Sequence, residues 1–176
     1  LMVTGGLMAP SGGTYRLLGE EMPIFDERRL AHRLRLGVVF DGGQLLNHLT
    51  VAENIALPLR YHRNLSKADE EEQVGRMLAL TGLGSWAGSM PGALGRNWQR
   101  RAGLARALML RPEVLLLDSP LAGLDARHRA WWLGFLGQLA AGHDWMEGRP
   151  MTLVVTADEL GSWRGLGRRF AALRNK

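Results

Sequence analysis

The sequence contains no cysteine, which excludes both a disulfide scaffold and a thiolate metal site. It has no apolar run approaching the ~20 residues that a membrane-spanning helix requires, and no signal peptide is visible. Its 176 residues, 46% of them hydrophobic, suffice for one domain with a sizeable core. We therefore expect a single domain over residues 1–176, held together by packing rather than by disulfides.

Lysine is scarce, so the net charge of +5 is carried almost wholly by arginine. A basic chain can bind nucleic acid or an anionic membrane, or it can simply have an arginine-rich surface. The arginines are spread along the chain, and the short clusters within 28–35 and 164–169 are mixed with apolar residues. The sequence therefore favours an arginine-rich surface, and we expect no nucleic-acid partner.

Residues 113–125, with the sequence EVLLLDSPLAGLD, are the most informative stretch of the chain. The apolar residues 114–117 are typical of a strand that a parallel sheet buries on both faces. Asp118 follows where this strand leaves the sheet, and a carboxylate at that place typically holds Mg²⁺. Standing alone, the stretch would fit a buried strand and an Asp-Ser-Pro turn equally well.

A second motif lies upstream, because residues 94–108, LGRNWQRRAGLARAL, align without a gap with the pattern L-S-G-G-Q-x-Q-R-x-x-[LI]-A-R-A-L. Together the two motifs resemble the signature, Walker B strand and D-loop of the nucleotide-binding subunits of ATP-binding cassette (ABC) transporters. Residues 37–41 resemble the Q-loop of that family, residues 49–54 the helix start after it, and residues 153–158 the H-loop. The resemblance covers nearly the whole chain.

This resemblance implies a fold class, cofactors and partners. The fold would be α/β, a P-loop NTPase-like cassette with a mostly parallel sheet and a helical subdomain over about residues 50–110. The cofactors would be ATP and Mg²⁺, and the partners a second nucleotide-binding subunit and transmembrane permease subunits. Such a subunit is cytoplasmic and peripheral, attached to the inner face of the plasma membrane through the permease.

The Walker A motif of the family, G-x-x-x-x-G-K-[ST], does not occur in the sequence. Residues 1–13 resemble instead the end of the helix that follows such a loop. We therefore expect that the phosphate-binding loop, and the aromatic residue that stacks on adenine in the family, would lie before residue 1. Family members usually continue past the last residues too, which makes the chain a partial domain by expectation.

Alternating apolar and polar residues, and short continuous apolar runs, locate the strands. They are expected at 14–19, 36–40, 114–117 and 151–155, with room for one more at 169–174.

Capping signals locate the helices. Thr50 and Glu53 form a capping box for a helix that Pro58 is expected to end. Ser66 is expected to begin a second helix, which ends at Gly82. A third begins near Gln99, and a fourth spans about 126–141 with a stripe of aromatic and leucine side chains expected to pack in the core.

Three catalytic positions of the family carry other residues here. Ser119 stands where the family has the glutamate that activates water, and Ala157 where it has the histidine that contacts the γ-phosphate. Asp41 replaces the Q-loop glutamine; it could approach a metal but would repel phosphate. A positioned base contributes roughly 10²- to 10⁴-fold to a rate, so the sequence predicts a slow or silent ATPase. Asp118 remains the expected ligand of Mg²⁺.

The signature loop departs from the family as well, since its residues are Leu94, Gly95, Arg96 and Asn97. In the family, Ser-Gly-Gly presents a hydroxyl and backbone N–H groups to the γ-phosphate on the partner subunit. The lost hydroxyl and the added side chains are expected to weaken this contact. Arg96 either contacts phosphate directly or is a solvated arginine. The D-loop is intact, with residues Leu121, Ala122, Gly123, Leu124 and Asp125.

Two functions of different class follow from this pattern. The first is an energy-coupling ATPase subunit of an ABC importer, with residues 5–7, 47–51 and 57–59 resembling the lipid-trafficking, solvent-tolerance type. The second is a degenerate, non-hydrolysing cassette that serves as a scaffold or regulatory half, or a decaying gene copy. The substitutions favour the second function for chemistry, while the first still describes descent and assembly. A nucleic-acid-directed ABC protein, expected to carry two cassettes, is a minor alternative.

Overall fold

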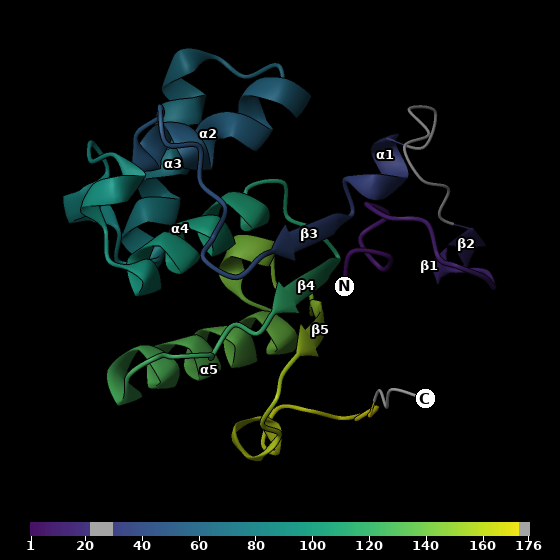
Figure 1. Ribbon diagram of the computed structural model, residues 1–176. Helices are drawn as coiled ribbons and strands as arrows, with labels where there is room; N and C mark the ends of the chain where they lie inside the picture. The colour runs from purple at the N-terminus through teal and green to yellow at the C-terminus, as the bar shows by residue number, and fades with distance from the viewer. Residues whose placement is uncertain (22–29, 173–176) are drawn as a thin grey trace.

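The computed structural model describes residues 1–21 and 30–172, and its centre is a three-stranded parallel sheet (Figure 1). The strands are β3 (Leu36–Val39), β4 (Val114–Asp118) and β5 (Thr152–Thr156), in the order β3-β4-β5. The three strands predicted here are confirmed to within one residue at each end. The expected α/β class with a mostly parallel sheet is confirmed as well.

Strand β4 is the buried centre of the sheet, because β3 and β5 flank it on both sides. Leu115 and Leu117 belong to the main core beneath the helices, while Val114 and Leu116 pack with Leu17 on the opposite face. Both faces of β4 are therefore covered. This explains why its sequence is a continuous apolar run rather than an alternating one.

Three helices form a group on one side of the sheet, namely α2 (Val51–His62), α3 (Lys67–Leu80) and α4 (Arg96–Leu108) (Figure 1). The predicted capping box is confirmed, since Thr50 Oγ1 accepts the Glu53 N–H at 3.2 Å and the Glu53 carboxylate accepts the Thr50 N–H at 2.8 Å. Ser66 caps α3 as predicted. Helix α4 begins at Arg96, earlier than the expected Gln99.

The prediction that Pro58 ends its helix is wrong, because α2 continues through Pro58 to His62. An internal proline costs about 3 kcal/mol through a lost hydrogen bond and a clash with the preceding turn. Against this, α2 buries Val51, Ile55 and Leu59, each at most 2% exposed, and each such side chain contributes about 1.5–3 kcal/mol. Packing therefore outweighs the local preference.

Helix α5 (Ala126–Ala141) has the predicted bounds. Asp125 caps its start, and Gly142 ends it with φ 111°, a left-handed conformation that favours glycine. Most of the predicted stripe is buried, as core packing requires: Trp132, Phe135, Leu136 and Leu139.

The remaining described elements are short. Strands β1 (Arg16–Leu17) and β2 (Glu20–Glu21) form an antiparallel pair, so the strand expected at 14–19 is shorter than predicted. The other short elements are α1 (Leu30–Arg33) and the 3₁₀ helices Gly84–Trp86, Pro91–Ala93, Asp144–Met146 and Gly161–Trp163. Of the strand expected at 169–174, residues 169–172 are not in a strand and the others lie outside the described residues. Among the described helices, none has the length and apolarity needed to cross a membrane.

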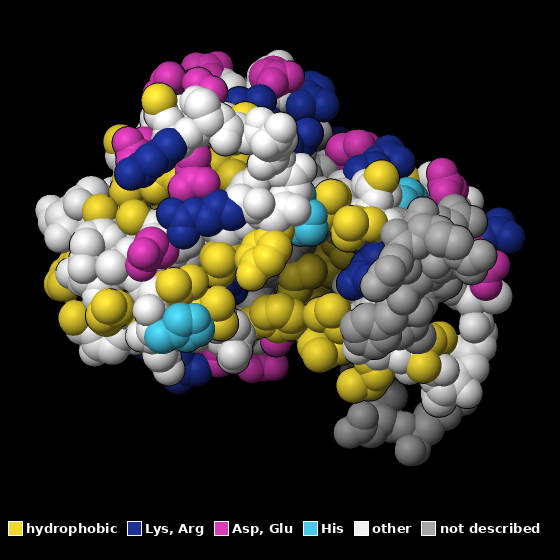
Figure 2. Space-filling model, turned by 90° about the horizontal axis from the view of Figure 1, so that it is seen from above, with side chains coloured by type: hydrophobic (Ala, Val, Ile, Leu, Met, Phe, Trp, Pro, Cys, Tyr) yellow, Lys and Arg dark blue, Asp and Glu magenta, His cyan; other side chains and the backbone are white. Residues whose placement is uncertain are grey.

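The arginines are interspersed with acidic side chains. Figure 2 shows one face with an apolar middle and charges of both signs around it. Several arginines pair with acids, as in Arg60 Nε to Glu70 at 2.9 Å and Arg111 Nη1 to Glu147 at 2.7 Å. On that face the charge pattern fits the predicted arginine-rich surface better than a basic patch.

Candidate functional site

The carboxyl ends of the three parallel strands bring four of the predicted site residues to one edge of the sheet. Asp118 is the last residue of β4 and Ser119 follows it. Ala157 follows β5, and Asp41 lies two residues past β3. In register, Asp118 lies beside Thr156. Residues separated by more than a hundred positions in the sequence therefore meet at this edge.

Thr156 orients the Asp118 carboxylate. Its hydroxyl donates to Asp118 Oδ1 at 2.7 Å and accepts the N–H of Ser119 at 3.1 Å. Thr156 was not predicted as a site residue, and its only signal in the sequence is its place just before Ala157. Within the described ranges, no group of three or more His, Cys, Asp or Glu side chains is placed to hold a metal ion. A single oriented carboxylate still suits Mg²⁺, which keeps water and phosphate ligands.

Ser119 has φ 43°, in the left-handed region that residues other than glycine rarely adopt. Its N–H is held by both the carbonyl and the hydroxyl of Thr156, each at 3.1 Å. Strained positions of this kind cluster at functional sites. The turn after β4 is therefore well defined, yet Ser119 brings to it only a hydroxyl. Ala157 is half-buried and packs against the main core without any polar group.

Asp41 is engaged by two guanidinium groups of α4. Its Oδ1 accepts from Arg100 Nη2 and its Oδ2 from Arg96 Nη2. Burial alone would raise the pKa of Asp41, but the hydrogen bond and charge of Arg100, together with Arg96, lower it below its usual value. The carboxylate is therefore anionic, and both of its oxygens already have cationic partners.

Arg100 is a site residue that the sequence analysis did not single out. Its side chain is 2% exposed. Besides Asp41, it reaches the segment after β4, where Nη1 donates to the carbonyls of Pro120 at 3.2 Å and Ala122 at 2.8 Å. The sequence does contain a signal for this pair, because Asp41 and Arg100 each stand where the family pattern has a glutamine. Two opposite charges therefore replace two neutral side chains.

The signature residues surround the start of α4. Leu94 is buried, and Gly95 is the N-cap residue without a side-chain capping bond. Asn97 is half-buried. Arg96 is 67% exposed, as expected for a solvated arginine, and its guanidinium is also paired with Asp41; a direct contact with phosphate stays a prediction. Helix α4 has no acid in its own first turn, but the Asp41 carboxylate is paired with its first residue, Arg96.

The D-loop is built into the surrounding structure. Leu121 and Leu124 are buried in the main core, while Ala122 and Gly123 are exposed. Asp125 caps α5, with Oδ1 accepting the His128 N–H at 2.8 Å and Oδ2 lying 2.7 Å from His128 Nδ1. The backbone and ring hydrogen bonds of His128 lower the pKa of Asp125.

A second arginine of α4 joins that helix to α5. The Arg101 guanidinium lies 3.6 Å from the ring centre of Trp131 on α5 and 4.5 Å from that of Trp98 on α4. Burial, with a smaller effect of the Arg127 charge, lowers the pKa of Arg101 to about 10. A cation–π contact contributes roughly 0.5–2 kcal/mol, so the contact with Trp131 helps to hold α4 against α5.

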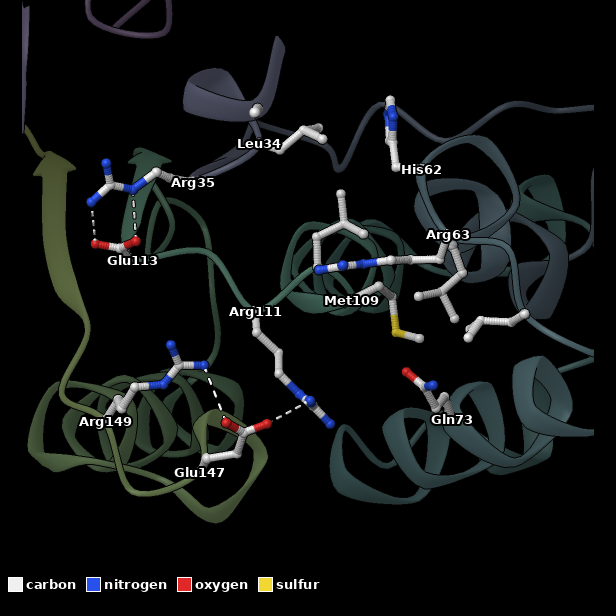
Figure 3. A pocket seen from close by; sticks show the side chains of 14 residues that line it. Leu34, Arg35, His62, Arg63, Gln73, Met109, Arg111, Glu113, Glu147 and Arg149 are labelled. Atoms are coloured by element: carbon white, nitrogen blue, oxygen red, sulfur yellow. Dashed lines mark hydrogen bonds and ion pairs between the residues drawn. The ribbon is translucent and has the colours of Figure 1, made fainter. Parts of the chain in front are cut away.

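A cavity of about 610 Å³ lies away from these residues, near the amino ends of β3 and β4 (Figure 3). Three ion pairs line it: Arg35 contacts Glu113 at 2.7 Å and 2.8 Å, and Glu147 contacts both Arg111 at 2.7 Å and Arg149 at 3.4 Å. None of the predicted site residues lines this cavity. It is therefore separate from the edge at which the strands end.

Comparisons with known proteins agree with this geometry. The family described as ABC transporter matches residues 1–122. The methionine import ATP-binding protein MetN 2 of Pseudomonas aeruginosa is 36% identical over 140 residues, 79% of this chain and 42% of that protein. The macrolide export ATP-binding/permease protein MacB of Azoarcus sp. is 34% identical over 160 residues, 90% of this chain and 24% of that protein.

Among solved structures, the dimeric structure of MJ0796, a bacterial ABC transporter cassette, superposes with a TM-score of 0.79 at 26% identity. The match covers 93% of this chain and 70% of that one. The chain spans less than half the length of the two curated relatives. The fold, the order of the motifs along it and these matches together place the chain in the ABC transporter family.

Proposed function

We propose that the chain is an ATP-binding subunit of an ABC transport system that hydrolyses ATP slowly or not at all. The observation that carries this proposal is the edge where β4 and β5 end. There Asp118 is oriented by Thr156, while Ser119 and Ala157 supply neither a carboxylate nor an imidazole. A site that keeps its metal-binding position but lacks a base and a γ-phosphate contact supports binding over hydrolysis.

The residues present fit ATP and Mg²⁺ in part. Asp118 would hold Mg²⁺, and the N-terminus of α4 would face a phosphate group, as helix N-termini favour anions. Bound Mg²⁺ neutralises phosphate charge. The 176 residues contain no Walker A sequence, so by themselves they supply few phosphate contacts. We therefore expect the chain on its own to bind ATP weakly and without the usual dependence on magnesium.

The partners proposed for the chain are a second nucleotide-binding subunit and transmembrane permease subunits, which would place it at the inner face of the plasma membrane. The similar MJ0796 cassette is described as dimeric, and this supports pairing. One relative is named for import and another for export, so identity alone favours neither direction. The sequence features at residues 5–7, 47–51 and 57–59 support an importer of the lipid or solvent-tolerance type.

An alternative is a cassette that never hydrolyses ATP and acts as a scaffold or regulatory half beside an active partner. The observation that favours it is the engagement of both Asp41 oxygens by Arg96 and Arg100. A carboxylate held in this way is not free to position water or metal. This alternative differs from the first proposal because it excludes any turnover and gives the chain a scaffold or regulatory role.

Nucleotide titration tests the ATP-binding half of the proposal. A fluorescent ATP analogue is titrated, with and without Mg²⁺, into the chain and into a version preceded by a P-loop segment from a related cassette. We expect weak, magnesium-independent binding by the chain and tight, magnesium-dependent binding by the extended version. In the extended version, Asp118→Asn should remove the magnesium dependence. Tight magnesium-dependent binding by the chain alone, or none by the extended version, would contradict the proposal.

A further inference from the structure

Residues 41–44, which follow β3, are attached to α4 by three arginines. Arg96 and Arg100 bind the Asp41 carboxylate, and Arg106 Nη2 donates to the carbonyls of Gly43 at 3.0 Å and Gln44 at 2.8 Å. The three arginines come from one helix and all act on one short segment. The contact is therefore built over three turns of α4.

The two backbones also touch. A Cβ on Gly103 would lie 2.6 Å from the Cα of Gly43, and a Cβ on Gly43 would lie 2.2 Å from the carbonyl oxygen of Gln99. Gly43 has φ 79° as well, so a side chain at this position would be both strained and crowded. The approach is close enough that only glycine fits on either side.

The same guanidinium that binds Asp41 reaches a third segment, because Arg100 donates to the carbonyls of Pro120 and Ala122 after β4. At 2% exposure, the Arg100 charge is balanced by Asp41. A buried charge that loses its partner is strongly destabilising. Asp41 therefore stabilises the contact between α4 and the segment after β4 as well as its own.

We propose that Asp41, Arg96, Arg100 and Arg106 form an internal clamp that fixes α4, residues 41–44 and residues 119–125 in one arrangement without any nucleotide. The clamp goes beyond the proposed function, because it describes how the nucleotide-facing segments are held when nothing is bound. It also occupies the Arg96 guanidinium within its own chain. An anion that approached the start of α4 would have to compete with Asp41 for this arginine.

Amide hydrogen exchange of the 176-residue chain, followed by mass spectrometry without nucleotide, tests the clamp. Asp41→Asn keeps the side-chain size but leaves Arg100 buried without a counter-charge. We expect exchange in residues 41–44, the first half of α4 and residues 119–125 to rise at least about tenfold.

Glu113→Gln is the matched control. It breaks the bidentate ion pair between Glu113 and Arg35. These residues directly precede β4 and β3, so the pair lies at the opposite edge of the sheet from Asp41. Exchange in the clamp segments of this variant should stay within about twofold of the unchanged chain. The proposal would be overturned if exchange in the clamp segments of Asp41→Asn rose by less than about twofold. It would also be overturned if that exchange rose only as much as in Glu113→Gln.

The double variant Asp41→Gln with Arg100→Gln tests the pairing itself. It removes both charges together, so its clamp segments should exchange more slowly than those of Asp41→Gln alone. If the single variants fail to fold, a folded double variant supports the clamp. A double variant that exchanges as fast as Asp41→Gln, or that also fails to fold, contradicts it. Every measurement is made without ATP, so the result does not depend on whether the chain binds nucleotide.

Discussion

Replacing Thr156 by valine should weaken the edge where Asp118 and Ser119 lie. Valine has nearly the same shape, so the change removes the bond to Asp118 Oδ1 and the acceptor for the Ser119 N–H. A hydrogen bond to a charged group contributes about 1.5–3 kcal/mol. Since the bond is only partly buried and Ser119 keeps the Thr156 carbonyl as a partner, we expect Thr156→Val to lower the free energy of unfolding by about 1–2 kcal/mol.

Urea denaturation measures this loss. With a slope near 2 kcal/mol per molar urea, the midpoint should fall by about 0.5–1 M. Thr152→Val is the matched control, because Thr152 begins the same strand and is exposed, and such a site should change stability by no more than about 0.5 kcal/mol. A midpoint shift in Thr156→Val no larger than that in Thr152→Val would refute the role assigned to Thr156.

Two further predictions concern stability. Pro58→Ala should raise the free energy of unfolding by about 1–2 kcal/mol, because regaining a helical hydrogen bond outweighs the lost restriction of the unfolded chain; a urea midpoint at or below that of the unchanged chain would count against it. The folded pKa of Asp41 is lowered, so its contribution is present above the unfolded pKa of about 3.9 and is lost as the pH falls through the folded pKa. The stability difference between the chain and Asp41→Asn should therefore stay constant above about pH 5 and shrink as the pH falls from about 4 to 3. A difference that is the same at about pH 5 and pH 3 would show that the Asp41 charge contributes nothing.

The sequence was a good guide where one local rule decides the structure. The apolar run of β4 could only suit a strand covered on both faces, and the capping box at Thr50 and Glu53 fixes the start of α2 by hydrogen bonds within four residues. The ends of α5 follow likewise from Asp125 and Gly142.

The sequence was a poor guide where distant segments decide the structure. Local preference predicts a helix end at Pro58, but the packing of α2 against α4 overrides it. The partners of Arg96 and Thr156 are 55 and 38 positions away in the chain. No spacing rule connects residues so far apart, and only the fold brings them together.

The central claim, that this cassette is impaired in catalysis, is tested by steady-state phosphate release from versions preceded by a P-loop segment. The first version keeps Ser119 and Ala157, the second carries Ser119→Glu with Ala157→His, and the third carries Ser119→Gln with Ala157→His. The glutamine control matches glutamate in size but cannot act as a base. We expect background turnover from the first and third versions, and an increase of about 10²-fold or more in the second, because only it has a positioned base. Brisk ATP hydrolysis by the first version would contradict the account, since it would mean that another residue activates water.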